Sequence, residues 1–125
     1  MKPQKFSIRK RIKSFLFAFN GLKILMTEEH NARIHLVAAI CAVIASIVFE
    51  ISAYEWIAVI VAIGLVFALE LMNSAIERIA DFIAPEKNEK IKKIKDLSAA
   101  GVLISAITAL IVGLIVFLPK ILGLC

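Results

Sequence analysis

Residues 56–81 read WIAVIVAIGLVFALELMNSAIERIAD, and this stretch decides the fold. Its first half contains only apolar residues and one glycine, and a helix that crosses a bilayer needs about 20 mostly apolar residues. Its second half adds Glu70, Asn73, Glu77 and Asp81. At about 100° per residue these four side chains fall within an arc of roughly 80°. The stretch therefore predicts a membrane-spanning helix with a polar stripe along one face.

The composition of the whole chain agrees with a membrane protein. Of its 125 residues 61% are hydrophobic, against about 45–50% in soluble domains, and the mean hydropathy is +0.91. We expect a single all-α membrane domain over 1–125, with transmembrane helices at about 31–49, 56–84 and 97–118. Pro85 is expected to end the second of these helices, because proline cannot continue a helix.

The N-terminal region, about 6–26, has the pattern of an amphipathic helix. Its apolar residues recur at steps of four and three, while the basic residues take the other faces. The apolar positions are Ile8, Ile12, Phe15, Phe19, Leu22 and Met26. This pattern predicts a helix that lies on the membrane surface; an ordinary basic membrane anchor explains it equally well.

Lys and Arg are distributed unevenly between the two sides of the predicted membrane segments. They concentrate in the N-terminal region and in the loop 86–96, whereas the link 50–55 has none. The positive-inside rule therefore places the N-terminus and this loop in the cytoplasm. The net charge of +5 then favours binding to anionic lipid headgroups or to a phosphorylated small molecule. We expect no nucleic acid partner.

The third apolar segment carries small residues at every fourth position. These are Gly101, Ser105, Ala109 and Gly113. Small side chains on one helix face allow close approach of another helix. The ridge predicts tight helix packing.

The acidic residues of the stripe are energetically unfavourable in a membrane unless their charge is compensated. A carboxylate at the centre of a bilayer costs at least about 2.5–3.5 kcal/mol, so Glu70, the deepest, requires water, a metal or another cation. The structural alternative is that the stripe pairs with Arg33 and Arg78 or is protonated. Oxygen ligands beside a lysine-rich loop favour Mg²⁺ with bound phosphates, because this ion takes one or two carboxylates and completes its shell with phosphate and water.

Other polar residues near the segment ends extend this pattern. Glu28 and Glu29 precede the first transmembrane segment and offer more carboxylate. Asp96 is expected to cap the N-terminus of the third helix. Lys95 would then stand where the helix N-terminus also attracts phosphate. The residues alone indicate an acidic, metal-binding site at the inner membrane interface.

Two blocks, ELMNSAIERIAD at 70–81 and IKKIKDLSAAGVL at 91–103, resemble the prokaryotic diacylglycerol kinase family. These are small integral membrane kinases that include the undecaprenol kinases. Weaker similarity in AFNGLK at 18–23 and EHNARIHL at 29–36 extends the match over almost the whole chain.

The resemblance implies phosphorylation of a membrane lipid alcohol with ATP and Mg²⁺. We expect diacylglycerol to become phosphatidic acid, with undecaprenol as the alternative acceptor. It also implies a homotrimer in the bacterial inner membrane with active sites shared between neighbouring subunits. By motif, Glu70 corresponds to the catalytic base, and Glu77 and Glu29 to the metal ligands. The choice between Glu28 and Glu29 stays open.

The remaining site residues also come from the resemblance. Asn73 corresponds to a residue near the transferred phosphate and, with Glu70, Asn31 and Ala99, to the lipid site. Phe17 stands where some relatives have an aromatic hydroxyl. The implied ATP site comprises Lys10, Phe17, Glu29, Glu77, Glu86, Lys87, Asn88, Lys95 and Asp96.

Two other classes of function remain as alternatives to a kinase. An acidic stripe can serve a small proton- or ion-coupled transporter as a proton relay, and a purely structural membrane protein ranks last because it leaves Glu70 without a role. His35 lies on the first transmembrane segment. It is expected to be a packing residue, or else to shape the lipid or metal site.

Overall fold

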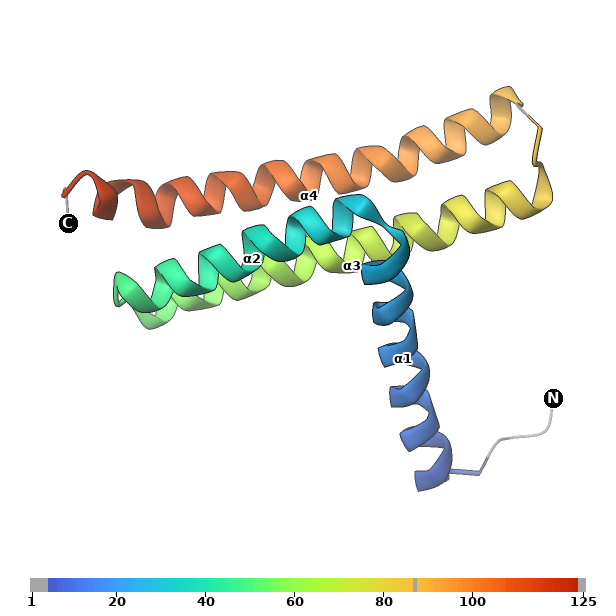
Figure 1. Cartoon of the computed structure of the whole chain (residues 1–125), viewed down its shortest axis with the longest axis horizontal. Coiled ribbons are helices and arrows are strands. Elements are labelled where there is room, and N and C mark those ends of the chain that lie inside the picture. The colour runs from blue at the N-terminus through green and yellow to red at the C-terminus, as the bar shows by residue number, and fades with distance from the viewer. Residues whose placement is uncertain (1–4, 87, 124–125) are drawn as a thin grey trace.

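The computed structural model describes residues 5–86 and 88–123, and every regular element in these residues is a helix. Its helices are α1 (Ile8–Glu28), α2 (His30–Val48), α3 (Ala53–Ile83) and α4 (Glu89–Ile121). Three of them, α2, α3 and α4, are long and apolar enough to cross a membrane. Figure 1 shows these three running alongside one another, with α1 projecting away at a steep angle. The predicted fold class is confirmed.

The N-terminal helix α1 is amphipathic and almost wholly exposed. Ser7 caps it, because its Oγ accepts a hydrogen bond from the Lys10 backbone N–H at 3.4 Å. The apolar side chains of Ile8, Phe15 and Phe19 are each more than half exposed. An exposed apolar face on a basic helix suits a lipid surface, which solvates it as water cannot.

The start of α3 is set by a capping box. The Ser52 side chain accepts from the Glu55 backbone N–H at 3.2 Å, and the Glu55 carboxylate accepts from the Ser52 N–H at 3.0 Å. This reciprocal pair satisfies two free N–H groups, so the helix begins at Ala53 rather than near 56. It ends at Ile83 before Pro85, with Ala84 in a non-helical conformation, as the residue before proline prefers.

The start of α4 differs more from the prediction. The helix begins at Glu89, well before the predicted start near 97, and its N-cap is Asn88, whose side chain accepts from the Lys90 N–H at 2.8 Å. The expectation that Asp96 caps this helix is wrong. Hydropathy detects only the apolar part of the helix, whereas Lys and Glu are good helix formers and extend it into the basic loop.

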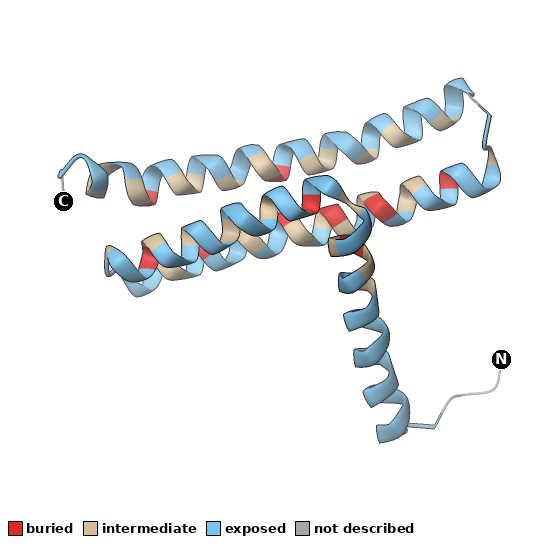
Figure 2. Cartoon of the chain, in the orientation of Figure 1, coloured by how far each residue is buried: buried red, intermediate tan, exposed pale blue. Residues whose placement is uncertain are grey.

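Contacts between the membrane helices are unequal. The antiparallel helices α3 and α4 form the principal pair, α2 packs on α3, and α2 and α4 touch little. Figure 2 shows that buried residues are scattered along the facing sides while most of each helix is exposed. This distribution suits a bilayer, where lipid tails are as apolar as the side chains and exposure has no aqueous penalty.

A sharp elbow joins α1 to α2. Glu29 is the single residue between the two helices, in an extended conformation with φ −109° and ψ 113°. Leu25 and Ala32 on either side are 1% and 0% exposed. The buried apolar pair anchors the elbow and holds the carboxylates of Glu28 and Glu29 beside α3.

The ridge of small residues packs only in part as predicted. Ser105 is fully buried, but a Cβ added to Gly101 or Gly113 would meet no atom within 4 Å. Within one chain, the glycines are therefore not used for close helix approach.

Candidate functional site

The polar stripe of α3 runs from a buried end to an exposed end. Glu70 is 4% exposed and Ser74 is 7% exposed. Glu77 is half-buried, and Asp81 is exposed. Glu70, the most buried carboxylate of the stripe, therefore lies deepest in the helix bundle.

The deepest carboxylate faces a histidine of another helix. Nε2 of His35 on α2 lies 3.1 Å from Oε1 of Glu70. The contact is close but does not have hydrogen-bond geometry, and Oε1 accepts no hydrogen bond from the described residues. His35, whose role the sequence left open, is therefore part of the site.

Asn73, one turn along from Glu70, adds a second unpartnered oxygen. Its Oδ1 is buried and accepts no hydrogen bond from the described part of the chain. A buried acceptor without a partner costs about 1–3 kcal/mol. Two such oxygens on one helix form a region that favours a donor or a cation from outside the chain.

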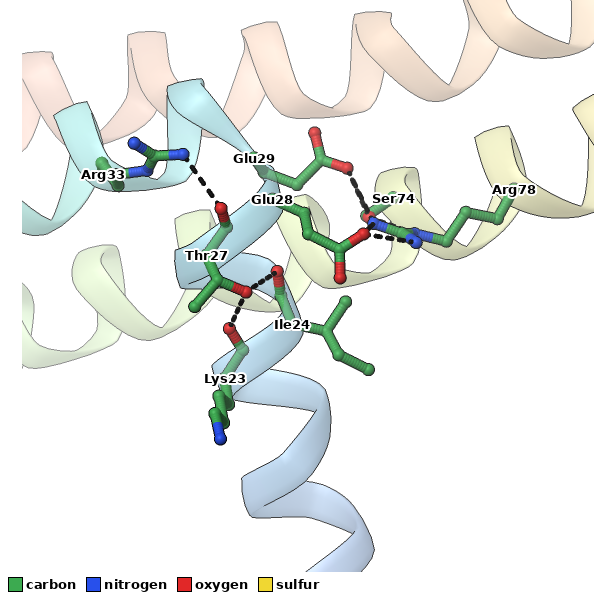
Figure 3. Close-up of polar contacts among 8 residues, drawn as sticks. All are labelled: Lys23, Ile24, Thr27, Glu28, Glu29, Arg33, Ser74 and Arg78. Atoms are coloured by element: carbon green, nitrogen blue, oxygen red, sulfur yellow. Dashed lines mark hydrogen bonds and ion pairs between the residues drawn. The ribbon is translucent and has the colours of Figure 1, made fainter.

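The elbow carboxylates form a network with α3 that Figure 3 shows. Ser74 donates its hydroxyl to Oε1 of Glu29 at 2.9 Å. The guanidinium of Arg78 lies 3.3 Å from Oε1 of Glu28 and 3.4 Å from Oε1 of Glu29, and its Nε donates to Ser74 at 3.3 Å. The network fastens the elbow to α3.

This network corrects one structural alternative for the stripe. Arg78 pairs with Glu28 and Glu29, and Arg33 donates to the Thr27 carbonyl at 3.1 Å. Neither arginine pairs with a carboxylate of the stripe in the described part of the chain. The sequence offered Arg78 only as a partner for the stripe and gave Ser74 no role, so their joint contact with the elbow carboxylates was not predicted. Their spacing of four residues on α3 is the signal that could have linked them.

Predicted nucleotide-binding residues lie where α3 and α4 approach the basic loop. Lys95 pairs with Asp81 across the two helices, and Lys92 donates to Asp96 at 2.7 Å on the same helix. Because α4 begins at Glu89, Lys95 is not at a helix N-terminus, and that argument for phosphate attraction is wrong. Lys95 can therefore attract phosphate only through its own positive charge, without a contribution from a helix N-terminus.

The loop candidates surround a small polar cavity at the same end. Glu86 and Asn88 line it together with Ala84 and Pro85, and its volume is about 330 Å³. Asn88 also caps α4. Lys87 lies outside the described residues.

Other predicted residues are not gathered at this place. Lys10 and Phe17 are exposed on α1, a helix that contacts α2 and α3 but not α4. Within one chain they are therefore not brought to Lys95. Asn31 is exposed in the first turn of α2, and Ala99 is exposed on α4.

The oxygen donors can be tested against the needs of Mg²⁺. Glu29 is held against α3 by its hydrogen bond from Ser74, Glu77 is half-buried three residues farther along α3, and Asn73 adds a buried oxygen that accepts no hydrogen bond from the described residues. In residues 5–86 and 88–123 there is no group of three or more His, Cys, Asp or Glu side chains that could hold a metal. Mg²⁺ commonly binds through one or two carboxylates, phosphate and water, so the donors present fit this ion when it arrives with a nucleotide.

Comparison with known proteins supports the family resemblance that the sequence motifs indicated. The family model described as prokaryotic diacylglycerol kinase matches residues 16–117. The chain is 34% identical over 119 residues to the undecaprenol kinase of Bacillus subtilis strain 168, covering 95% of this chain and 97% of that one.

Diacylglycerol kinases of two other bacteria are similar. The protein of Escherichia coli K12 is 33% identical over 100 residues, which is 80% of this chain and 82% of the relative. That of Helicobacter pylori strain 26695 is 33% identical over 106 residues, with 84% and 82% covered.

Proposed function

The chain belongs to the prokaryotic diacylglycerol kinase family, and on that premise we propose that it transfers the γ-phosphoryl group of ATP to the hydroxyl of undecaprenol. Membership makes the chain a membrane lipid kinase with ATP as phosphate donor. The transporter and structural alternatives lose their support, since the relatives are lipid kinases. Undecaprenol is favoured because the B. subtilis relative aligns along nearly the full length of both chains.

Diacylglycerol is the second candidate acceptor. The family description and the E. coli relative name this lipid, and phosphatidic acid would be its product. The two acceptors share a primary hydroxyl and long hydrocarbon tails, so the same chemical groups serve either.

The observation that carries the proposal is the buried carboxylate of Glu70, whose Oε1 accepts no hydrogen bond from the described residues. It lies deep in α3, where a lipid alcohol can present its hydroxyl while its tails remain in the bilayer. The hydroxyl donates to Glu70 Oε1 and gives up its proton there as its oxygen attacks the γ-phosphorus. The bond from this phosphorus to the bridging oxygen breaks, and ADP leaves.

His35 has a positioning role in this scheme. Its ring lies 3.1 Å from the reacting carboxylate and limits the orientations that Glu70 can adopt. General base catalysis requires the acceptor within about 2.6–3.2 Å of the proton. A carboxylate held against a ring is better placed for this than one free to rotate.

Phosphoryl transfer is mostly positioning and charge neutralisation. Glu29 and Glu77 would hold Mg²⁺, with the Asn73 oxygen nearby, and the ion would neutralise the phosphates of ATP. Glu29 rather than Glu28 is the proposed ligand, since it accepts from the buried Ser74. Lys95 and Asp96 contact the nucleotide, with Glu86, Lys87 and Asn88 in the adjoining loop.

The orientation follows from the source of ATP and the basic residues. The N-terminus and the loop at 86–96 face the cytoplasm, so the nucleotide reaches the exposed end of the stripe. The enzyme acts in the bacterial inner membrane as a homotrimer, in which α1 of a neighbouring subunit supplies Lys10 and Phe17. The separation of these residues from α4 within one chain supports this.

A direct assay tests the proposed acceptor. Purified protein in lipid nanodiscs is given labelled ATP and Mg²⁺ with undecaprenol or dioleoylglycerol, and the phosphorylated lipid is measured. We expect undecaprenol to give the higher kcat/KM. A preference for dioleoylglycerol would select the second candidate, and no phosphorylated lipid with either would contradict the proposal.

A further inference from the structure

Arg78 is a charged side chain beside the proposed metal ligands that the mechanism above does not use. It follows Glu77 on α3, and its guanidinium reaches the elbow between α1 and α2 (Figure 3). Its Nε donates to Ser74 Oγ at 3.3 Å, and both terminal nitrogens donate to Oε1 of Glu28 at 3.3 Å. One of these nitrogens also lies 3.4 Å from Oε1 of Glu29. A single side chain therefore contacts both glutamates of the elbow.

The contacts to Glu29 fall on one of its two carboxylate oxygens. Oε1 accepts from the Ser74 hydroxyl at 2.9 Å and from Arg78 at 3.4 Å. Figure 3 shows the other oxygen pointing away from both donors. Carboxylates that bind metals are commonly hydrogen-bonded in this way, and such partners orient the ligand. The second oxygen of Glu29 can therefore bind a metal ion while the first keeps its donors.

Glu28 makes a different set of contacts. It is the last residue of α1, and its Oε1 takes two N–H groups from the Arg78 guanidinium. Its side chain is 54% exposed, against 31% for Glu29. A carboxylate already paired with a guanidinium is a poorer ligand for a second cation, because the two positive charges repel each other. Of the two adjacent glutamates, Glu29 is thus the better placed to bind a metal.

We propose that Arg78 is a positioning residue that selects Glu29 rather than Glu28 as a ligand of nucleotide-bound Mg²⁺. The inference rests on the proposed function and adds a residue to it. The guanidinium engages Glu28 and, together with Ser74, fixes the orientation of Glu29. In this scheme Arg78 touches neither the lipid nor the nucleotide, so it acts only through the two glutamates.

A purely structural role for Arg78 leads to a different expectation. Its ion pairs are about half exposed, and exposed pairs contribute about 0.2–1 kcal/mol. The elbow also has an apolar anchor in the buried Leu25 and Ala32. Arg78→Gln should therefore still fold, so its metal binding can be measured. A residue that only fastened the elbow would not change which glutamate binds the metal.

The test measures metal binding directly, with Mn²⁺ as a paramagnetic substitute for Mg²⁺. Electron paramagnetic resonance of the protein in nanodiscs with a non-hydrolysable ATP analogue gives the Mn²⁺ affinity without turnover. Titration of activity with Mg²⁺ gives the midpoint and kcat separately. Glu28→Gln and Glu29→Gln are each made in the wild type and in an Arg78→Gln background. Arg33→Gln is the matched control, because this second arginine near the elbow donates to the Thr27 carbonyl.

The expected result is a loss of discrimination between the two glutamates. In the wild-type background, Glu29→Gln should weaken Mn²⁺ binding at least about tenfold more than Glu28→Gln, since only the former removes a ligand. In the Arg78→Gln background the two should differ by less than about threefold, because residues in contact are coupled and the released Glu28 can then bind the metal.

Arg78→Gln by itself should separate metal binding from turnover. Its Mg²⁺ midpoint should rise about tenfold, the lower end of the range for groups that orient metal ligands, while kcat at saturating Mg²⁺ stays within about twofold. Arg78→Lys keeps the charge but not the planar fork. It should give an intermediate midpoint and an intermediate discrimination, which keeps the test valid when Arg78→Gln fails to fold. Arg33→Gln should match wild type.

Other results would overturn the assignment. An unchanged difference between Glu28→Gln and Glu29→Gln in the Arg78→Gln background shows that Arg78 does not select the ligand. A lower Mg²⁺ midpoint in Arg78→Gln shows that the guanidinium only repels the metal. Equal effects of Arg33→Gln and Arg78→Gln show a general disturbance of the elbow. If wild type phosphorylates no lipid, the proposed function fails, whereas the Mn²⁺ measurement still decides the role of Arg78.

Discussion

The two halves of α3 belong to one helix but meet different surroundings. Glu70 contacts His35, Ser74 and Arg78 contact the elbow carboxylates, and Asp81 pairs with Lys95. In the other half, side chains between Val59 and Phe67 line an apolar groove between α2, α3 and α4, and Val59 forms a small core with Val116 and Ile51. Polar contacts are directional and specify partners, whereas apolar surface in a membrane packs against protein or lipid with little difference in free energy.

The polar half of α3 therefore carries the groups proposed for the reaction, and the apolar half packs against neighbouring helices. The polar half should tolerate few substitutions, since its polar atoms have partners or are proposed to await them. The apolar half should tolerate change as long as its volume is kept. The following substitutions test this contrast, from the largest expected effect to the smallest.

Glu70→Gln should cause the greatest loss of activity. The amide keeps the shape of the carboxylate but cannot take a proton, and general base catalysis contributes roughly 10²–10⁴-fold. We expect kcat to fall by about this factor while ATP still binds, as measured by nucleotide protection of thermal stability. Glu55→Gln, at the opposite end of α3, is the control and should retain near-normal kcat. Near-normal activity in Glu70→Gln would remove the chemical role of the polar half.

Glu77→Gln should chiefly raise the requirement for Mg²⁺. Loss of one of the two proposed carboxylate ligands should weaken metal binding by at least about tenfold, since even residues behind the ligands matter by 10–100-fold. A titration of activity against Mg²⁺ concentration measures this. Glu50→Gln, in the turn between α2 and α3, serves for comparison. A lower kcat with an unchanged Mg²⁺ midpoint would assign Glu77 a different role.

His35→Ala should lower kcat by about tenfold, because Glu70 loses the ring that restricts it and misplacement of a reacting group is costly. The KM for ATP should stay within about twofold. His35→Gln, which keeps a planar polar side chain at this position, should recover part of the loss. His30→Ala removes the exposed histidine of the same helix and is the control. Equal effects of His30→Ala and His35→Ala would contradict a positioning role.

Val116→Ala on α4 probes the core that the apolar half of α3 forms. Val116 is 4% exposed in the small core, and loss of its buried methyl groups should lower the free energy of unfolding by about 1–2 kcal/mol. Equilibrium denaturation in detergent measures the change. The Mg²⁺ midpoint should not move. A shift of that midpoint would show that the two halves are coupled.

Arg78→Gln should have the smallest effect on stability. Its ion pairs with Glu28 and Glu29 are about half exposed, and exposed pairs contribute about 0.2–1 kcal/mol. We expect the free energy of unfolding to fall by less than in Val116→Ala under the same denaturation conditions. A larger loss would show that the elbow depends on Arg78 for its fold.

Much of the fold follows from local patterns. Residues 56–67 are apolar without interruption, Pro85 ends α3, and the spacing of Ile8, Ile12 and Phe15 marks α1. Hydropathy failed at the start of α4, where Asn88 and a charged segment form a regular helix without any apolar pattern. It failed because a helix depends on backbone hydrogen bonds and caps, which charged residues satisfy as well as apolar ones.

The sequence by itself determined which segments form helices, which of them suit a membrane, and that Glu70, Asn73 and Glu77 fall on the same side of α3. These properties depend on neighbours within a few turns. Only the tertiary structure decided that His35 faces Glu70, that Ser74 and Arg78 join the elbow carboxylates, and that an open groove meets this site. Partners such as Glu29 and Ser74 stand 45 positions apart, and local periodicity carries no information about which helix faces meet at that separation.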